Sequence, residues 1–427
     1  MTNTDLHGKG FKLFTLGCKV NQCETQLLRE RLEAAGLRES EPGKTASLCI
    51  VNTCAVTSVA QGKSARALRK MKKENPGAIM VAIGCGVSAA PERFDEADMV
   101  IEQKDKDGAV ERILGVSNTL LVTSRFEGHA RAFLKIQDGC DSFCSYCIVP
   151  YLRGEPRSKT LELILEEARN IAGKGYGELV LTGIHLGIYG RDIGTCPSLA
   201  GVVRRLLDEN LFPRIRLSGV ECTEVTDELI SLITSDNALC PHLHIALQSG
   251  SAKVLGDMNR GYSPGDYIAV IRKIREKAPM TAITTDIITG FPAESEADFT
   301  ETLDICEKVE FSRIHVFPYS RRGGTAAAQR WKSGSGRQAS IRASRLREKA
   351  RELAEIYARQ FVGEKVRVLV ESKSRGRSVE GYTDHYVRAR IDNFVVDAGT
   401  LVEGIASGVS EGLLVLDKEN ITIGERS

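Results

Sequence analysis

Three closely spaced cysteines are the strongest chemical signal in this sequence of 427 residues. Cys140, Cys144 and Cys147 form a C-x-x-x-C-x-x-C pattern within GCDSFCSYC, residues 139–147. Three thiolates on one loop suit a cubane iron–sulfur cluster, which normally takes four ligands, so one iron would stay open to bind another molecule. Zinc is an alternative, but a structural zinc site needs four ligands and no paired Cys or His lies nearby. Buried structural thiols fit less well, because polar residues separate the three cysteines.

The total of 12 cysteines is too few for a disulfide scaffold, which leaves metal-binding, catalytic or core roles for the other nine. Their positions relative to the expected strands help to assign these roles. Cys18, Cys54 and Cys85 each lie one to three residues beyond the end of an expected strand. The carboxyl ends of parallel strands form one crevice, so these three thiols could meet there. The remaining cysteines match no motif, and we expect ordinary core thiols at Cys23, Cys49, Cys196, Cys222, Cys240 and Cys306.

Alternating apolar runs predict the elements that carry the first three thiols. We expect strands at residues 11–16, 48–51 and 79–83, and helices at 21–35 and 58–72. Strands that alternate with helices form parallel sheets. Residues 10–124 are therefore predicted to form an N-terminal parallel α/β domain.

A second alternating series occupies residues 125–330. It offers strands at residues 133–137, 178–181, 214–217, 243–247, 283–288 and 314–317, and helices at 161–172, 226–233, 267–277 and 297–309. Six such βα units fit a partial (βα)6 barrel better than a doubly wound sheet. Polar groups follow the strand ends, where such barrels carry their active face, notably Cys140, His185, Glu221 and Gln248.

Charge is unevenly distributed along the chain, although 58 Lys and Arg against 56 Asp and Glu give a net charge of only +2. Residues 321–378 hold 16 basic and 5 acidic residues, a net charge of +11. We expect a basic helical linker at 331–361, with a turn at 333–336 and a helix at 341–361. Short β-type runs then predict a small β-barrel at 362–427, with strands at 366–370, 386–391, 394–396 and 412–416.

A basic cluster in this last segment suggests nucleic-acid binding. Lys373, Arg375 and Arg377 lie on a loop with Ser and Gly between two expected strands. Lys and Arg neutralise phosphates and position a nucleic-acid backbone without reading its sequence. A solvated charged face is the alternative interpretation.

Composition excludes several classes of protein. With 42% hydrophobic residues the chain is not disordered. Its apolar runs are far shorter than the roughly 20 residues that span a bilayer, so no membrane partner is expected. Residues 1–10 lack the apolar stretch of a secretory signal, and we expect a cytoplasmic protein with reduced thiols.

The C-x-x-x-C-x-x-C loop resembles the cluster-binding motif of radical S-adenosylmethionine (SAM) enzymes. The resemblance implies that the open iron chelates the methionine part of SAM and that the reduced cluster cleaves SAM to a 5′-deoxyadenosyl radical.

Further blocks resemble the methylthiotransferases within that group. TLGCKVNQ (residues 15–22), VNTC (51–54) and GC (84–85) resemble their amino-terminal domain; YLRG (151–154), RS (157–158), LHIALQSGS (243–251), MNR (258–260) and DIITGFP (286–292) resemble their barrel. The resemblance covers nearly the whole chain and implies a second [4Fe-4S] cluster held by Cys18, Cys54 and Cys85. It also implies a TRAM-like RNA-binding domain at 362–427. One departure is that Gly86-Val87-Ser88 follows Cys85 where the family commonly has an aromatic residue.

The same resemblance suggests contacts to SAM. Gly183, Ser218, Glu221 and Gln248 occupy positions that approach its amino acid and ribose, and a satisfied polar residue at a strand end is the alternative for each. The sequence assigns no catalytic residue.

The resemblance finally implies a substrate. It predicts conversion of N6-threonylcarbamoyladenosine at position 37 of tRNA to its 2-methylthio derivative, because KVNQ (residues 19–22) resembles that branch of the family. The expected partners are a tRNA anticodon stem-loop, a reducing electron donor and a sulfur donor. The alternatives are the branch that acts on isopentenyladenosine and, from a different class, a non-catalytic iron–sulfur RNA-binding sensor.

Overall fold

A computed structural model describes residues 6–117, 120–126, 128–194, 197–332, 336–373 and 377–424. The chain forms two compact units. The first, here called the cysteine unit, comprises Met1–Arg125, Asp138–Arg157 and Ser320–Ala328. The second, the barrel unit, comprises Phe126–Gln137, Ser158–Tyr319 and Gln329–Ser427. The domain boundaries expected from the sequence stay predictions.

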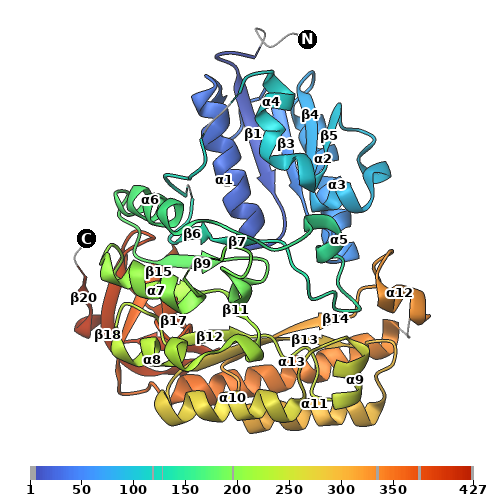
Figure 1. The fold of residues 1–427 in the computed structure, drawn as a ribbon. Helices are drawn as coiled ribbons and strands as arrows, with labels where there is room; N and C mark the ends of the chain where they lie inside the picture. The colour runs from blue at the N-terminus through green and yellow to red at the C-terminus, as the bar shows by residue number, and fades with distance from the viewer. Residues whose placement is uncertain are drawn as a thin grey trace. The chain divides into compact units, whose positions relative to one another are not determined.

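The cysteine unit contains a parallel sheet with the strand order β2-β1-β3-β4-β5, of which Figure 1 labels β1, β3, β4 and β5. Its strands are β1 (Gly10–Thr15), β2 (Arg38–Glu39), β3 (Leu48–Thr53), β4 (Ile79–Gly84) and β5 (Met99–Ile101). The three expected strands and their parallel pairing are confirmed. The short edge strands β2 and β5 were not predicted.

Helices cover both faces of this sheet. They are α1 (Lys19–Ala34), α2 (Ser58–Glu74), α3 (Cys85–Ala89) and α4 (Ala109–Leu114). Side chains alternate between faces along β3, so Ile50 packs in one apolar cluster with Leu32 of α1, and Cys49 packs in another with Leu68 of α2. Cys49 is therefore a core thiol, as expected.

The chain passes from one unit to the other within the short elements β7 (Gln137–Asp138), β8 (Arg157–Ser158) and α12 (Ala326–Arg330), and the short helix α5 (Val149–Arg153) lies between β7 and β8. Of these, α5 belongs to the cysteine unit and follows the second group of cysteines. Pro150 lies in its first turn, and the helix is followed by Gly154, which adopts a positive φ of 74°. A residue without a β-carbon suits that backbone conformation.

The barrel unit contains an arc of parallel strands. Its members are β6 (Ala132–Lys135), β9 (Leu179–Thr182), β10 (Ile215–Leu217), β11 (Gly219–Val220), β12 (His242–Ile245), β13 (Ala282–Thr289) and β14 (Arg313–Pro318). They pair as β6-β9-β10 and β11-β12-β13-β14. Only Ser218 separates β10 from β11, so the two sheets follow one another along the arc. The expected partial (βα)6 barrel is confirmed.

The helices of the barrel unit are α6 (Leu161–Ala172), α7 (Leu199–Asp208), α8 (Asp227–Ser235), α9 (Ala252–Asp257), α10 (Pro264–Lys277) and α11 (Glu296–Val309). Hydroxyl side chains cap their amino termini by accepting a backbone N–H, at Thr160, Ser198, Thr226, Ser251, Ser263 and Ser295. The expected helices match α6, α8, α10 and α11, whereas α7 and α9 were not predicted. Among the described residues, no helix is both long and apolar enough to cross a membrane.

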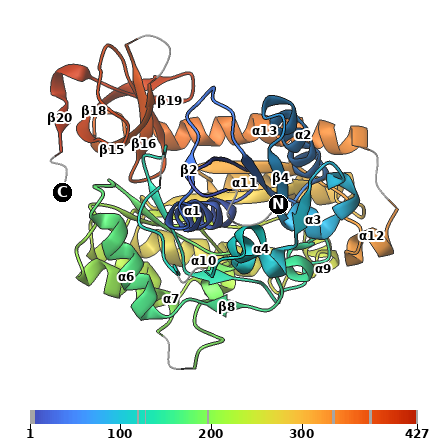
Figure 2. The ribbon, with the colours of Figure 1, turned by 90° about the horizontal axis from the view of Figure 1, so that it is seen from above.

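A long helix, α13 (Gly336–Arg359), leads into the C-terminal β domain, as Figure 2 shows. It packs on the barrel, because the Tyr357 hydroxyl donates to the Met280 carbonyl at 2.6 Å. Its basic side chains pair with barrel acids: Arg342 lies 2.7 Å from Glu294. Part of the +11 charge expected on this segment is therefore neutralised within the protein.

The C-terminal strands form a closed barrel through an additional pairing of β15 with β18. They are β15 (Lys365–Lys373), β16 (Val379–Thr383), β17 (Arg388–Ile391), β18 (Leu401–Ser410), β19 (Leu413–Leu416) and β20 (Thr422–Ile423). The expected small β-barrel is confirmed. The expected strand at 394–396 is wrong, because Asn393 takes a positive φ of 54° in a turn and residues 394–396 form a loop. Strands β16, β18 and β20 were not predicted.

Candidate functional site

The first three candidate ligands follow the strands of the cysteine unit. Cys18 directly precedes α1, Cys54 follows β3, and Cys85 begins α3 directly after β4. Burial raises the pKa of the Cys54 thiol, a backbone hydrogen bond opposes the rise, and the charges of Cys18 and Cys85 add to it. A β-carbon on Gly17, next to Cys18, would lie 3.1 Å from Cys54 Sγ, and one on Gly86, next to Cys85, would lie 3.1 Å from the Cys54 carbonyl oxygen. The structure therefore brings together three loops that are far apart in sequence and that each carry one of these cysteines.

Glycines allow the loops to approach these thiols. Gly17 has a φ of +109°, and a β-carbon there would lie 3.1 Å from Cys54 Sγ. A β-carbon on Gly86 would lie 2.8 Å from the side chain of Thr53. The glycine after Cys85, where the sequence departs from the family pattern, is thus required by close packing against β3.

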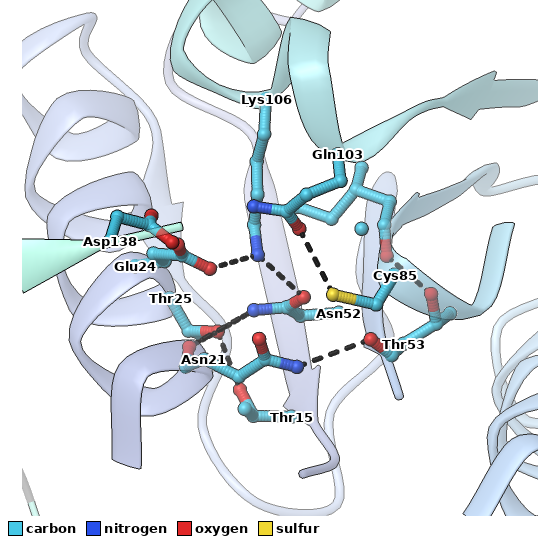
Figure 3. Close-up of polar contacts among 12 residues, drawn as sticks. Thr15, Asn21, Glu24, Thr25, Asn52, Thr53, Cys85, Gln103, Lys106 and Asp138 are labelled. Carbon is cyan, nitrogen blue, oxygen red and sulfur yellow. Dashed lines mark hydrogen bonds and ion pairs between the residues drawn. The ribbon is translucent and has the colours of Figure 1, made fainter. Parts of the chain in front are cut away.

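Asparagine and threonine side chains hold the loops in place (Figure 3). Asn21 Nδ2 donates to the carbonyls of Leu16 at 2.8 Å and Thr53 at 3.1 Å. Asn52 Nδ2 donates to the Asn21 carbonyl at 3.0 Å and to Thr25 Oγ1 at 2.9 Å. Since these bonds join the segments beside Cys18 and Cys54, they fix the two loops relative to each other.

A buried set of charges adjoins this network. Lys106 forms an ion pair with Glu24 and donates to Asn52 Oδ1 at 2.9 Å. Arg153 Nη1 lies 2.8 Å from both Glu24 and Asp138. Burial alone lowers the pKa of Arg153, but the charges of Glu24 and Asp138 raise it well above its ordinary value. Sequence reasoning gave none of these four residues a role, because their contacts cross 82 and 129 residues and leave no local pattern.

The second cysteine triad lies on a closed loop of the same unit. The Cys140 N–H donates to the Gly154 carbonyl at 3.0 Å, and the Cys147 N–H donates to the Cys144 carbonyl at 2.9 Å. Gly139 has a φ of +73° and no room for a β-carbon against the Glu155 carbonyl. Cys144 is buried, whereas Cys140 and Cys147 are half-buried. The backbone of the loop that carries these three thiols is therefore held in place by hydrogen bonds and close packing.

The spacing of the thiols bears on the choice between zinc and an iron–sulfur cluster. Among the described residues, neither triad belongs to a group whose ligand atoms all lie within 4.8 Å of one another. Zinc–sulfur bonds of about 2.3 Å would hold the sulfurs of one tetrahedral zinc site roughly 4 Å apart. Each triad instead supplies three soft sulfur donors, the ligand type that iron–sulfur clusters take.

The residues expected to contact SAM lie at carboxyl ends of barrel strands. Gly183 follows β9, Ser218 separates β10 from β11, Glu221 follows β11, and Gln248 lies beyond β12. Among the described residues, the buried Ser218 Oγ has no hydrogen-bond partner. Gln248 holds a φ of +64°, which is unusual for a residue with a side chain. An unsatisfied hydroxyl and local backbone strain at one strand edge fit a ligand site.

Glu221 already has a partner in the protein. Arg260 Nη2 lies 2.8 Å from Glu221 Oε1, and His185 Nε2 lies 2.6 Å from Glu224. Arg260 belongs to the MNR motif, but sequence reasoning gave it no role. A ligand that reaches Glu221 would therefore meet an ion pair rather than a lone carboxylate.

Comparisons with known proteins identify the family. Residues 134–306 match the Radical SAM superfamily, and residues 11–103 match the Uncharacterized protein family UPF0004. The Threonylcarbamoyladenosine tRNA methylthiotransferase MtaB of Chlamydia pneumoniae is 38% identical over 90% of this chain and 92% of its own length. The chain belongs to the radical SAM methylthiotransferase family.

Other relatives of this methylthiotransferase differ in their named substrates. The MtaB protein of Thermotoga maritima is 36% identical over 89% of this chain and 91% of its own length. The tRNA-2-methylthio-N(6)-dimethylallyladenosine synthase of Carboxydothermus hydrogenoformans is 34% identical over 75% of this chain and 78% of its own length.

A solved structure shares the fold of this methylthiotransferase. The radical S-adenosylmethionine methyltransferase TsrM from Kitasatospora setae, solved with cobalamin and a [4Fe-4S] cluster, has a TM-score of 0.56. The match covers 75% of this chain and 74% of that chain at 12% identity. At that identity, the likeness supports the fold alone.

The residues predicted to contact RNA are only partly described. Lys373 ends β15, but its side chain lies outside the described structure, as does all of Arg375. Arg377 is exposed. RNA contact by these three residues of the methylthiotransferase stays a prediction.

Proposed function

We propose that this methylthiotransferase converts N6-threonylcarbamoyladenosine at position 37 of tRNA to its 2-methylthio derivative. The observation that carries the proposal is the presence of two cysteine triads in one compact unit, each on loops fixed by internal hydrogen bonds. Relatives named for threonylcarbamoyladenosine, at 32–38% identity over 87–94% of this chain, support the substrate.

The cofactors are two [4Fe-4S] clusters and SAM. Cys140, Cys144 and Cys147 would hold one cluster and leave an iron open for SAM, and Cys18, Cys54 and Cys85 would hold the other. When bound, these groups supply the radical that activates the adenine carbon and the methylated sulfur that is transferred. The protein contributes thiolate ligands and fixed loops, and it shields Cys54 and Cys85 from solvent.

The barrel edge would orient SAM. Ser218 can donate or accept a hydrogen bond that no described side chain satisfies. A β-carbon on Gly183 would meet the Gln137 side chain at 3.0 Å, so glycine keeps this edge narrow and its backbone accessible. Glu221, held by Arg260, can accept hydrogen bonds from ribose hydroxyls or an ammonium group.

The partners would be a tRNA anticodon stem-loop, a reducing electron donor and a sulfur donor, in the cytoplasm. Lys373, Arg375 and Arg377 would contact the RNA backbone, because guanidinium and ammonium groups neutralise phosphates. The target base must leave its stack to reach the clusters, which loop nucleotides do more readily than paired ones.

Isopentenyladenosine is the second candidate substrate, because the dimethylallyladenosine synthases match at 32–34% identity. Because the chain belongs to a family of enzymes, we no longer consider the alternative of a non-catalytic iron–sulfur sensor.

Defined RNAs distinguish the two substrates. The anaerobically reconstituted enzyme, with SAM, reductant and sulfide, is incubated with matched anticodon stem-loops that carry one or the other nucleoside. Mass spectrometry of the digested RNA should show a methylthio group on threonylcarbamoyladenosine. A gain confined to isopentenyladenosine would contradict the proposed substrate while keeping the chemistry.

A further inference from the structure

Four buried charged side chains link the two cysteine triads of the cysteine unit. The side chains of Arg153, Glu24, Lys106 and Asp138 are 2%, 8%, 7% and 11% exposed. Two cations and two anions balance one another. Burying charged groups costs desolvation free energy, which is offset only when each group is paired. We therefore looked for a role of this network beyond packing.

One end of this network lies at the stem of the second triad. Arg153 ends α5, six residues after Cys147. Its neighbour Gly154 accepts the Cys140 N–H at 3.0 Å. Asp138, two residues before Cys140, binds Arg153 Nη1 at 2.8 Å and also accepts the Gly139 N–H at 2.8 Å. Arg153 thus connects the segment after Cys147 with the segment before Cys140, and so closes the loop that carries Cys140, Cys144 and Cys147; we call this connection the clamp.

The other end lies among the loops of the first triad (Figure 3). Arg153 Nη2 donates to Asn21 Oδ1 at 2.7 Å, three residues after Cys18. The same Asn21 donates to the carbonyl of Thr53, which directly precedes Cys54. Lys106 extends the network from Glu24 to Asn52. A single guanidinium is therefore bonded to segments adjoining both triads.

The shape of arginine explains why this residue occupies the position. Its two terminal nitrogens present donors in a rigid plane and reach Glu24, Asp138 and Asn21 at once. Lysine carries the same charge on a single nitrogen, so it cannot span the same acceptors with this geometry.

We propose that Arg153 is a positioning residue that fixes the separation of the two clusters. The inference rests on the proposed function, since it requires a cluster on each triad. Transfer between two sites depends on near-attack geometry, and a displacement of about 1 Å can cost on the order of a hundredfold in rate. Loss of the clamp should therefore uncouple SAM cleavage from product formation.

The test compares Arg153→Gln, Arg153→Lys and a matched control, Arg29→Gln. Arg29 also lies in the cysteine unit, on α1, and forms its ion pair with Glu39 at 2.9 Å, outside the network of Arg153, Glu24, Lys106 and Asp138. Iron content and unfolding temperature report folding. Pulsed electron paramagnetic resonance of the reduced protein without RNA reports the distribution of distances between the two clusters.

In Arg153→Gln we expect a broadened distance distribution and a roughly tenfold or larger rise in 5′-deoxyadenosine formed per methylthio product. Arg153→Lys, which keeps the buried charge, should load both clusters and still broaden the distribution. Arg29→Gln should match the wild type.

A wild-type distribution and product ratio in a fully loaded Arg153→Lys protein would overturn the inference, even if Arg153→Gln failed to fold. The distance measurement needs no RNA substrate, so it still decides the inference if the wild type fails to modify threonylcarbamoyladenosine. That failure would count against the proposed function alone.

Discussion

Cys54 is buried at the end of β3, where its thiol is influenced by both Cys18 and Cys85. The spacing of strands and cysteines was enough to predict that these three thiols could lie at one edge of the sheet, because the carboxyl ends of parallel strands share that edge. The clamp around Arg153 could not be predicted in this way. Its bond to Glu24 joins positions 129 residues apart, and such a pairing depends on the finished fold.

Replacing Cys54 should separate the two reactions. Cys54→Ala removes one ligand of the first triad and leaves Cys140, Cys144 and Cys147 unchanged. We expect the reduced variant to release 5′-deoxyadenosine from SAM but to form no methylthio product, as measured by chromatography and mass spectrometry. Methylthio product at the wild-type level would show that Cys54 is not a ligand.

Ser218 should affect SAM binding without affecting stability. Its buried hydroxyl has no partner among the described residues, so Ser218→Ala should change the free energy of unfolding by less than about 0.5 kcal/mol. A lost hydrogen bond to SAM, worth about 1 kcal/mol, should raise the Kd for SAM about fivefold. Equilibrium binding of SAM to the reconstituted protein measures this, and an unchanged Kd would remove Ser218 from the SAM site.

The observed helices and strands agree with those predicted from the sequence where the apolar periodicity is strong and uninterrupted. Helix α6 begins and ends where its pattern does, with a Thr160 cap. Strand β18 was missed because Gly404 and Gly408 interrupt its apolar alternation, yet pairing with β15 and β19 holds it extended. Tertiary pairing outweighs local propensity in such a strand.

A buried carboxylate joins the parallel barrel to the C-terminal β domain within the barrel unit. Glu178, fully buried, lies 2.6 Å from Arg214 and 3.0 Å from Arg216. Arg214 and Arg216 in turn donate to the Thr383 carbonyl of β16, each at 3.2 Å. Burial alone would raise the pKa of Glu178, but these arginines lower it well below its ordinary value.

Glu178→Gln should therefore destabilise the protein strongly. The substitution leaves buried guanidinium groups without their shared carboxylate, a change that typically costs about 3–5 kcal/mol. Chemical denaturation followed by circular dichroism should show this loss. A change below about 1 kcal/mol would mean that the arginines are satisfied without Glu178.

Over the whole molecule, the net charge does not show which basic residues form ion pairs within the protein. Residues 321–378 carry a charge of +11, but Arg342 and Lys349 of α13 pair with Glu294 and Glu307 of the barrel. A charge count cannot distinguish such internal pairs from an RNA-binding surface. The sequence did predict a parallel α/β sheet, a partial barrel and a small β-barrel, because apolar runs that alternate with helices or with turns are typical of each.

Iron content and the Mössbauer spectrum, measured on the reconstituted protein and on two triple variants, would show whether each triad holds one cluster. One variant replaces Cys18, Cys54 and Cys85 with alanine, and the other replaces Cys140, Cys144 and Cys147. Two cubane clusters predict about eight irons per chain in the wild type and about four in each variant. SAM should perturb the spectrum only where Cys140, Cys144 and Cys147 remain. A variant that loses all of its iron, or keeps all of it, would contradict the assignment of one cluster to each triad.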